Sequence, residues 1–235
     1  MPHVALDPLD LAALLCSRVC HDVISPVGAI VNGLEVLEDE MDADMRAFAL
    51  DLIKKSATTA SARLQFCRLA FGAAGSAGAS IDTGDAEKVT RGLIGDDKIK
   101  LEWNAPRILL AKNKVKVALN LCLIAAACIP RGGVIVLSMT GEGDDTALKV
   151  EAKGANARLA SSVPSLLTGA PDTGHVDAHG IQPFYTGLVA RECGLTLSVR
   201  QEAEMITIDA MPVTLADTLL APAAPAMPDA VSSAA

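Results

Sequence analysis

His21 is the residue of this chain with the clearest capacity for chemistry. It lies in the run Arg18-Val19-Cys20-His21-Asp22-Val23-Ile24-Ser25-Pro26, directly before a carboxylate and five positions before a proline. Apolar residues around it recur every three or four positions, which predicts one stripe of an amphipathic helix. The stripe comprises Ala12, Cys16, Val19, Val23, Val27, Ile30, Leu34 and Leu37. Since each residue turns the helix by about 100°, we expect the His21 imidazole to point away from the stripe, into solvent.

The neighbours of His21 favour the transfer of a phosphoryl group. Imidazole is nucleophilic near neutral pH without special activation. Asp22 is expected to orient the ring by accepting one of its N–H groups, and Ser25, one turn on, is expected to contact phosphoryl oxygens. We therefore predict that His21 is a phosphoacceptor and that Asp22 and Ser25 complete its immediate site.

Two long helices are expected to carry this site. Asp7-Pro8 is a good helix start, and the first helix is predicted to run to about Glu38. A short acidic turn at 39–44 precedes a second helix, which ends at about Phe71 before a glycine-rich segment, 72–78. The sequence thus predicts a helical hairpin. Because a lone hairpin of this length leaves a wide apolar surface, we expect two copies to form a homodimer with a four-helix bundle.

The geometry of the hairpin indicates further candidates for phosphate stabilisation and for partner docking. If the turn centres near residue 41, His21 lies level with about residue 62, so Arg63 is a candidate for stabilising phosphate, as is Arg18, one turn before His21. The surface between His21 and the turn is the candidate docking face for a partner. Its residues are Ile24, Val27, Gly28, Val31 and Asn32 on the first arm and Lys54, Thr58 and Ser61 on the second.

From about residue 81 the pattern changes to mixed α/β. We predict strands at 98–103, 134–140, 146–152, 195–200 and 205–210, and helices at 114–129 and 184–193. The predicted domains are a hairpin at 1–74, an α/β domain at 75–215 and a disordered tail at 216–235. The fold class is therefore α plus a two-layer α/β sandwich.

Composition narrows the function classes. The net charge of −8 argues against nucleic-acid binding, which needs a basic surface. We find no run of eighteen uncharged apolar residues and no signal-peptide pattern, so we expect no membrane partner and a cytoplasmic location.

Six cysteines lie in apolar helical patterns and are interpreted as reduced core residues. They are Cys16, Cys20, Cys67, Cys122, Cys128 and Cys193.

The motif HDVISP resembles the phosphoacceptor box of histidine kinases. The stretch from Leu119 to Ala125, followed by Ile129-Pro130-Arg131-Gly132-Gly133, resembles the N-box helix and turn of the kinase ATP-binding domain. The resemblance implies that the second domain has the Bergerat-type ATPase fold of those kinases.

The residues that would bind ATP are missing from these boxes. Ile124 stands where the resemblance places a magnesium-binding asparagine, and Ala152 where it places the aspartate that binds adenine. The second glycine box reads Gly180-Ile181-Gln182-Pro183-Phe184-Tyr185-Thr186, with bulky side chains where backbone N–H groups would approach phosphate. The resemblance therefore predicts a degenerate domain without ATP-dependent kinase activity.

Over residues 7–212 the chain resembles the ChpT family of alphaproteobacterial histidine phosphotransferases, most specifically in LCSRVCHDVISPVGAIVNGLEVL. This resemblance implies a homodimer that takes phosphate from the receiver of a hybrid histidine kinase (CckA-like). The phosphate then passes to response regulators of the cell cycle (CtrA-like and CpdR-like). Mg²⁺ would come from the receiver, so no bound cofactor or metal is expected. Two alternatives stay open: a pseudokinase scaffold that binds receivers without phosphotransfer, and an atypical ATP-dependent histidine kinase.

One loop holds a second pair of histidines. His175 and His179 are spaced by four residues, with Asp172 and Asp177 beside them, which is compatible with zinc binding. Glycines flank the loop, however, and it falls where a kinase has its ATP lid. We interpret it as a mobile or partner-binding segment.

Overall fold

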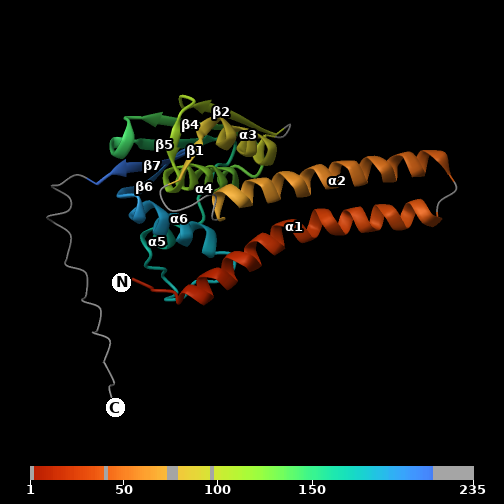
Figure 1. Cartoon of the computed structure of the whole chain (residues 1–235), viewed down its shortest axis with the longest axis horizontal. Helices are drawn as coiled ribbons and strands as arrows, with labels where there is room; N and C mark the ends of the chain where they lie inside the picture. The colour runs from red at the N-terminus through yellow and green to blue at the C-terminus, as the bar shows by residue number, and fades with distance from the viewer. Residues whose placement is uncertain (1–2, 40–41, 73–78, 96–97, 214–235) are drawn as a thin grey trace, which may run out of the picture.

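The computed structural model describes residues 3–39, 42–72, 79–95 and 98–213. It begins with a long antiparallel hairpin of α1 (Pro8–Asp39) and α2 (Ala43–Ala70), shown in red and orange in Figure 1. Aspartate caps start both helices: Asp7 Oδ1 accepts from the backbone N–H of Leu9 at 2.8 Å, and Asp42 Oδ1 accepts from those of Asp44 and Met45. The predicted helix ends are confirmed to within a few residues, whereas part of the predicted acidic turn, 40–41, lies outside the described residues.

The contact between α1 and α2 differs from the predicted stripe. Pro26 and Gly33 are buried on α1, whereas the predicted members Val27 and Leu34 are 44% and 48% exposed. The reason is close backbone approach: a Cβ built on Gly33 would lie 2.6 Å from Cγ1 of Ile53. Proline and glycine therefore form the tight contact of α1 with α2, and the bulkier Val27 and Leu34 lie beside that contact.

A five-stranded sheet forms the base of the second part. Its order is β2 (Ile99–Asn104), β4 (Gly133–Thr140), β5 (Ala147–Lys153), β7 (Met205–Pro212) and β6 (Leu195–Glu202). The β2–β4 pair is parallel and the other pairs are antiparallel. A 3₁₀ turn, η1 (Gly143–Asp145), joins β4 to β5, and Lys114 Nζ donates to the carbonyls of Gly143 and Asp144 in this turn. The five predicted strands are confirmed, and four of them pair as the antiparallel hairpins β4–β5 and β6–β7.

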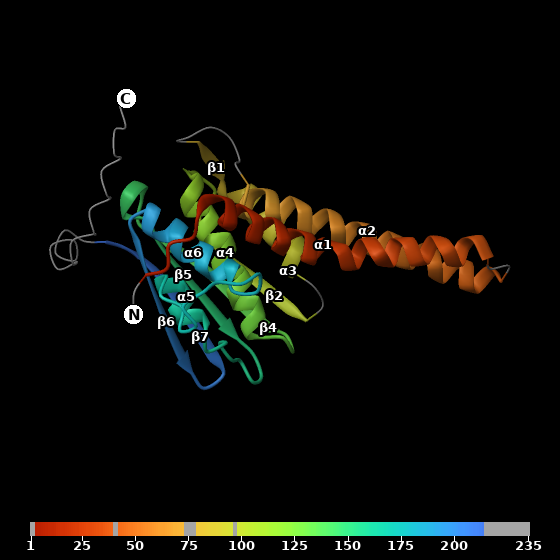
Figure 2. The same ribbon diagram turned by 90° about the horizontal axis from the view of Figure 1, so that it is seen from below.

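Helices cover one face of this sheet (Figure 2). They are α3 (Thr83–Ile94), α4 (Lys112–Cys128), α5 (Val163–Thr168) and α6 (Ile181–Glu192). A small two-stranded sheet pairs β1 (Ser80–Asp82) with β3 (Leu109–Ala111). The predicted class, a helical hairpin followed by a two-layer α/β sandwich, is confirmed. The sequence missed β1, β3 and α5, which are short, and also α3, a helix of 12 residues.

The two parts are joined at both arms of the hairpin. Near the end of α2, Phe66 and Ala70 belong to the main hydrophobic core, and Nδ2 of Asn120 on α4 donates to the carbonyl of Ala70 at 3.2 Å. At the start of α1, the side chains of Leu11, Leu14 and Leu15 pack against a small cluster on α5 and α6, namely Leu166, Ile181 and Phe184. The backbone N–H of Val4 also donates to the carbonyl of Gly169 at 2.9 Å. The end of the hairpin that holds the start of α1 and the end of α2 is therefore packed against the α/β part, while its other end projects away (Figure 1).

The predicted domain boundary at 74/75 and the predicted tail at 216–235 both lie outside the described residues.

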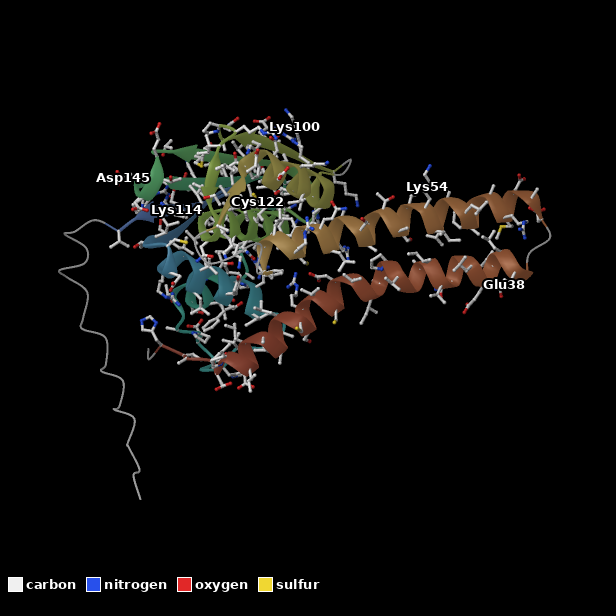
Figure 3. The ribbon with its side chains drawn as sticks, viewed as in Figure 1. Glu38, Lys54, Lys100, Lys114, Cys122 and Asp145 are labelled. Atoms are coloured by element: carbon white, nitrogen blue, oxygen red, sulfur yellow. The ribbon has the colours of Figure 1, made fainter. Side chains whose placement is uncertain are left out.

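Two of the six cysteines are exposed and Cys193 is half-buried, which corrects the expectation that all six are core residues. Cys16 and Cys20 are exposed on α1, because they lie off the tight contact with α2. Cys67, Cys122 and Cys128 are buried, and burial raises the pKa of the Cys122 thiol to about 12. Figure 3 shows Cys122 inside the helical layer over the sheet.

By length and composition alone, α1 passes as a membrane-spanning helix over Pro8–Glu38, which differs from the expectation that no segment would. Only 6% of the most apolar window is buried within the chain. A single such helix near the N-terminus is weak evidence of a membrane span, because a helix whose apolar side packs against another protein chain has the same composition.

Candidate functional site

His21 lies near the middle of α1 with 73% of its side chain exposed, so its expected exposure is confirmed. Its Nδ1 lies 3.3 Å from Oδ1 of Asp22, the next residue along the helix. When Nδ1 carries the proton and donates it to this carboxylate, Nε2 keeps its lone pair. In that tautomer Nε2 has the lone pair that a nucleophile needs, on a side chain that is largely exposed.

Asp22 is in turn held by Arg18, one turn earlier on the same helix. Arg18 Nε donates to Oδ2 of Asp22 at 2.9 Å, and both side chains are mostly covered. The carboxylate thus uses one oxygen for the arginine and the other for the histidine ring. The structure brings the predicted residues Arg18, His21 and Asp22 together, with the arginine charge directed toward the carboxylate.

Arg63 reaches this site from α2, as the predicted register of the hairpin requires. Its Nη1 donates to the backbone carbonyl of Asp22. That carbonyl would normally accept from the backbone N–H four residues later, but this position is Pro26, which has no N–H. Arg63 therefore satisfies a carbonyl that the proline leaves without a helical partner. Its predicted contact with phosphate stays a prediction.

The other predicted residues lie on several parts of the hairpin surface. Ser25 is exposed one turn after His21. Most of the docking candidates are also exposed, and Gly28 is half-buried. The exposed ones are Ile24, Val27, Val31, Asn32, Lys54, Thr58 and Ser61. Figure 3 shows Lys54 pointing away from α1. Thr58 and Ser61 line a groove shared with α3, which the sequence could not indicate because α3 was not predicted.

A histidine from the α/β part lies beside His21. The ring centroids of His21 and His179 are 6.1 Å apart, and the rings are nearly perpendicular at 77°. The His175/His179 loop was noted in the sequence, but nothing there indicated that one of its histidines meets the phosphoacceptor candidate. Packing of α1 against α6 brings the two together.

Asp177 fixes the backbone that carries His179. Its Oδ1 accepts from the backbone N–H of Gly180 at 2.7 Å and of His179 at 3.0 Å. These bonds, that from Gly180 foremost, lower the pKa of the Asp177 carboxyl below its usual value. The segment that was expected to be mobile or partner-binding is therefore organised by a carboxylate directly before α6.

Behind this loop lies a cavity of about 990 Å³ at the place where the resemblance puts ATP. Arg18 contributes to its wall from α1. Its other lining residues include Ile124, Arg131, Asn156, Arg158, Asp177, His179 and Gln182. Gln182 is buried, and its Nε2 donates to Oδ1 of Asn120 at 3.0 Å. Gln182, which stands within the second glycine box, is thus part of a buried amide pair with Asn120. Ala152, which stands at the position of the adenine-binding aspartate, is buried within β5.

The zinc interpretation of the loop receives no support. In the described part of the chain, no group of three or more histidine, cysteine, aspartate or glutamate side chains could hold a metal ion. His175 Nδ1 lies 3.1 Å from the carbonyl of Thr173, within its own turn. His179, by contrast, lies against the His21 ring.

Comparison with known proteins agrees with this architecture. Residues 83–205 match the family model described as histidine phosphotransferase C-terminal domain. The chain is 50% identical over 207 residues to the protein phosphotransferase ChpT of Brucella abortus (strain 2308), covering 88% of this chain and 98% of that protein. It is also similar to the solved structure of a bacterial phosphotransferase, with a TM-score of 0.81 and 47% identity over 89% of this chain and 100% of the other. The chain therefore belongs to the histidine phosphotransferase family of two-component signalling.

Proposed function

We propose that this protein carries phosphoryl groups on Nε2 of His21 as the intermediate step of a phosphorelay. The observation that carries this proposal is the exposed imidazole, whose other nitrogen lies 3.3 Å from Asp22. A ring with one nitrogen engaged and the other open to solvent can meet an activated phosphate on a second protein.

The transfer proceeds by in-line attack on an aspartyl phosphate. The Nε2 lone pair forms the N–P bond, the P–O bond to the partner's carboxylate breaks, and that carboxylate leaves with the bonding electrons. The imidazole becomes cationic, still with its proton on Nδ1, and the Asp22 carboxylate beside it stabilises this charge. Attack by a second partner's aspartate reverses the sequence and restores neutral His21.

The partners of this relay are proposed from family resemblance. The donor is the receiver domain of a hybrid histidine kinase (CckA-like), and the acceptors are response regulators of the cell cycle (CtrA-like and CpdR-like). Receivers would supply both the reacting aspartate and Mg²⁺. This chain would then need only to present His21 and a complementary surface.

We also propose that the phosphate does not come from ATP bound to this chain. The positions that resemble nucleotide-binding boxes hold Ile124, Ala152 and Gln182. The side-chain amide of Gln182 donates to Asn120 at the wall of the cavity. The segment around Gln182 would therefore not act as a flexible loop that binds phosphate. The α/β part would act as a frame for the hairpin and as part of the docking surface.

A second copy of the chain is the proposed partner for the projecting end of the hairpin. Along α1, Ile24, Val27, Val31 and Leu34 are 69%, 44%, 48% and 48% exposed. Their spacing places them on one side of the helix, and we call them the apolar strip. The half of the strip farther from His21 would pack in a four-helix bundle, while the half around Ile24 would meet the receiver. Such a dimer would cover part of the apolar side of α1 with protein, consistent with a cytoplasmic location.

The test is a phosphotransfer assay with a purified, radiolabelled phospho-receiver. Wild-type protein should gain an acid-labile, alkali-stable label, and His21→Ala should gain none while unfolding at the same temperature, because the side chain is exposed. His175→Ala is the matched control and should label normally. A scaffold would bind the phospho-receiver without taking the label, and labelling by ATP alone would indicate a histidine kinase.

A further inference from the structure

We propose that His179 is a further catalytic residue of this site, donating a hydrogen bond to the phosphoryl group as it is transferred to and from His21. The inference rests on the proposed function, since it assigns a second side chain to the same reaction. It also gives the α/β part a direct chemical role.

The first support is the position of the two rings. The centroids are 6.1 Å apart and the rings meet nearly at right angles, so an edge of one ring faces the other. Nδ1 of His21 is engaged by Asp22, which leaves Nε2 as the site of phosphorylation. A phosphoryl group on Nε2 projects three oxygens from the ring, into the range where a neighbouring imidazole can donate to one of them.

The second support is the availability of the His179 ring. Within the described residues, neither of its ring nitrogens has a hydrogen-bond partner, and the two hydrogen bonds that position the residue involve backbone atoms of His179 and Gly180 with Asp177. An imidazole carries an N–H donor whether neutral or protonated. His179 can therefore donate to phosphate without first losing another hydrogen bond.

The third support is that both rings are positioned by one packed contact. Leu14 and Leu15 on α1 pack against Ile181 and Phe184 at the start of α6. His21 follows these leucines by about two turns, and His179 directly precedes α6. Oδ1 of Asp177 accepts from the backbone N–H of His179 in the turn before α6, so Asp177 is a positioning residue.

The charges around the two rings agree with this role. Arg18 is paired with Asp22, and Arg63 is bonded to the carbonyl of Asp22. These two arginines are thus already engaged in holding the helix and its carboxylate. An additional donor aimed at the phosphoryl oxygens would offset the charge that develops when the P–O bond to the receiver breaks and the N–P bond forms.

The experiment measures single-turnover transfer from a labelled phospho-receiver to the full-length chain, and separately the affinity for the unphosphorylated receiver. His179→Ala is expected to lower the transfer rate roughly tenfold to hundredfold, with receiver affinity unchanged. This is less than the loss of one charge-stabilising donor costs in a site that excludes water, because His21 is exposed. His179→Gln, which keeps an N–H donor, should recover part of the rate. His175→Ala, in the same loop, is the matched control and should transfer at the wild-type rate.

A second measurement does not depend on rate. Phosphorylation of His21 should shift the side-chain ¹⁵N resonances of His179 and leave those of His175 in place. The inference would be overturned if His179→Ala transferred phosphate at the wild-type rate, or if its receiver affinity fell by the same factor as its transfer rate. The proposed function would stand in both cases. Failure of wild-type protein to accept the label at all would overturn both.

Discussion

Arg63 on α2 donates a hydrogen bond to the backbone carbonyl of Asp22 on α1, the carbonyl that Pro26 leaves without its helical donor. The proline after the phosphoacceptor candidate and the arginine across the hairpin are thus parts of one arrangement. Arg63 thereby ties α2 to the helical turn that carries His21.

This arrangement predicts a coupling between Pro26 and Arg63. Arg63→Ala should lower the free energy of unfolding by about 1–3 kcal/mol, because a half-buried carbonyl loses its donor. In a Pro26→Ala background the restored backbone N–H can bond to Asp22, so the same substitution should cost less. Urea unfolding of the four proteins of this cycle, at one protein concentration, measures the difference. Equal costs in both backgrounds would show that the arginine acts independently of the proline.

Asp22→Asn should slow phosphotransfer to His21 by about tenfold or more, since a carboxylate that fixes a histidine tautomer and stabilises its cation can contribute far more than this. The effect on the free energy of unfolding should stay below about 1 kcal/mol, as for other partly exposed ion pairs. Arg18→Ala, which leaves the carboxylate in place, should slow transfer less. Single-turnover labelling measures both rates, and transfer at the wild-type rate by Asp22→Asn would contradict the assigned role.

Two glycines of α1 should respond in opposite ways to alanine. Gly33→Ala should destabilise the protein by about 1–3 kcal/mol, because the new Cβ would lie 2.6 Å from Cγ1 of Ile53. Gly28→Ala is the matched control: its Cβ would meet nothing within 4 Å, and it should stabilise the helix by roughly 0.5–1 kcal/mol. Thermal unfolding of both variants tests the prediction. Similar effects for the two would mean that the tight contact does not exist in solution.

The proposed dimer predicts that Leu34→Glu yields a monomer, because a charge would be buried where the projecting ends of two hairpins meet. Leu109→Glu on β3, where the leucine is 73% exposed on the α/β part, is the control and should stay dimeric. Light scattering coupled to gel filtration measures the mass directly. A wild-type protein that is monomeric at micromolar concentration would contradict the bundle.

Helical periodicity made much of the fold and part of the site predictable. The exposure of His21 followed from its place opposite Val19 and Val23, and the approach of Arg63 followed from the length of the hairpin. The tight contact through Pro26 and Gly33 did not follow, because hydrophobic patterns favour large side chains and carry no information on backbone distance. Thus Val27 and Leu34, members of the predicted stripe, lie outside the contact between α1 and α2.

The position of His179 could not be predicted for a different reason. Its contact with His21 depends on how the α/β part packs against α1 through Leu14 and Phe184, and no local pattern encodes such a long-range contact. The helix α3 was missed too, and with it the groove that Thr58 and Ser61 share with that helix.

The attachment of both hairpin arms to the α/β part, through Leu11 on one arm and Phe66 on the other, has a kinetic consequence. The surroundings of His21 are already ordered before any partner arrives, so an incoming receiver does not incur the entropy loss of assembling them. We therefore expect the frequency of productive collisions, rather than an internal rearrangement of this chain, to limit how fast phosphate passes through it.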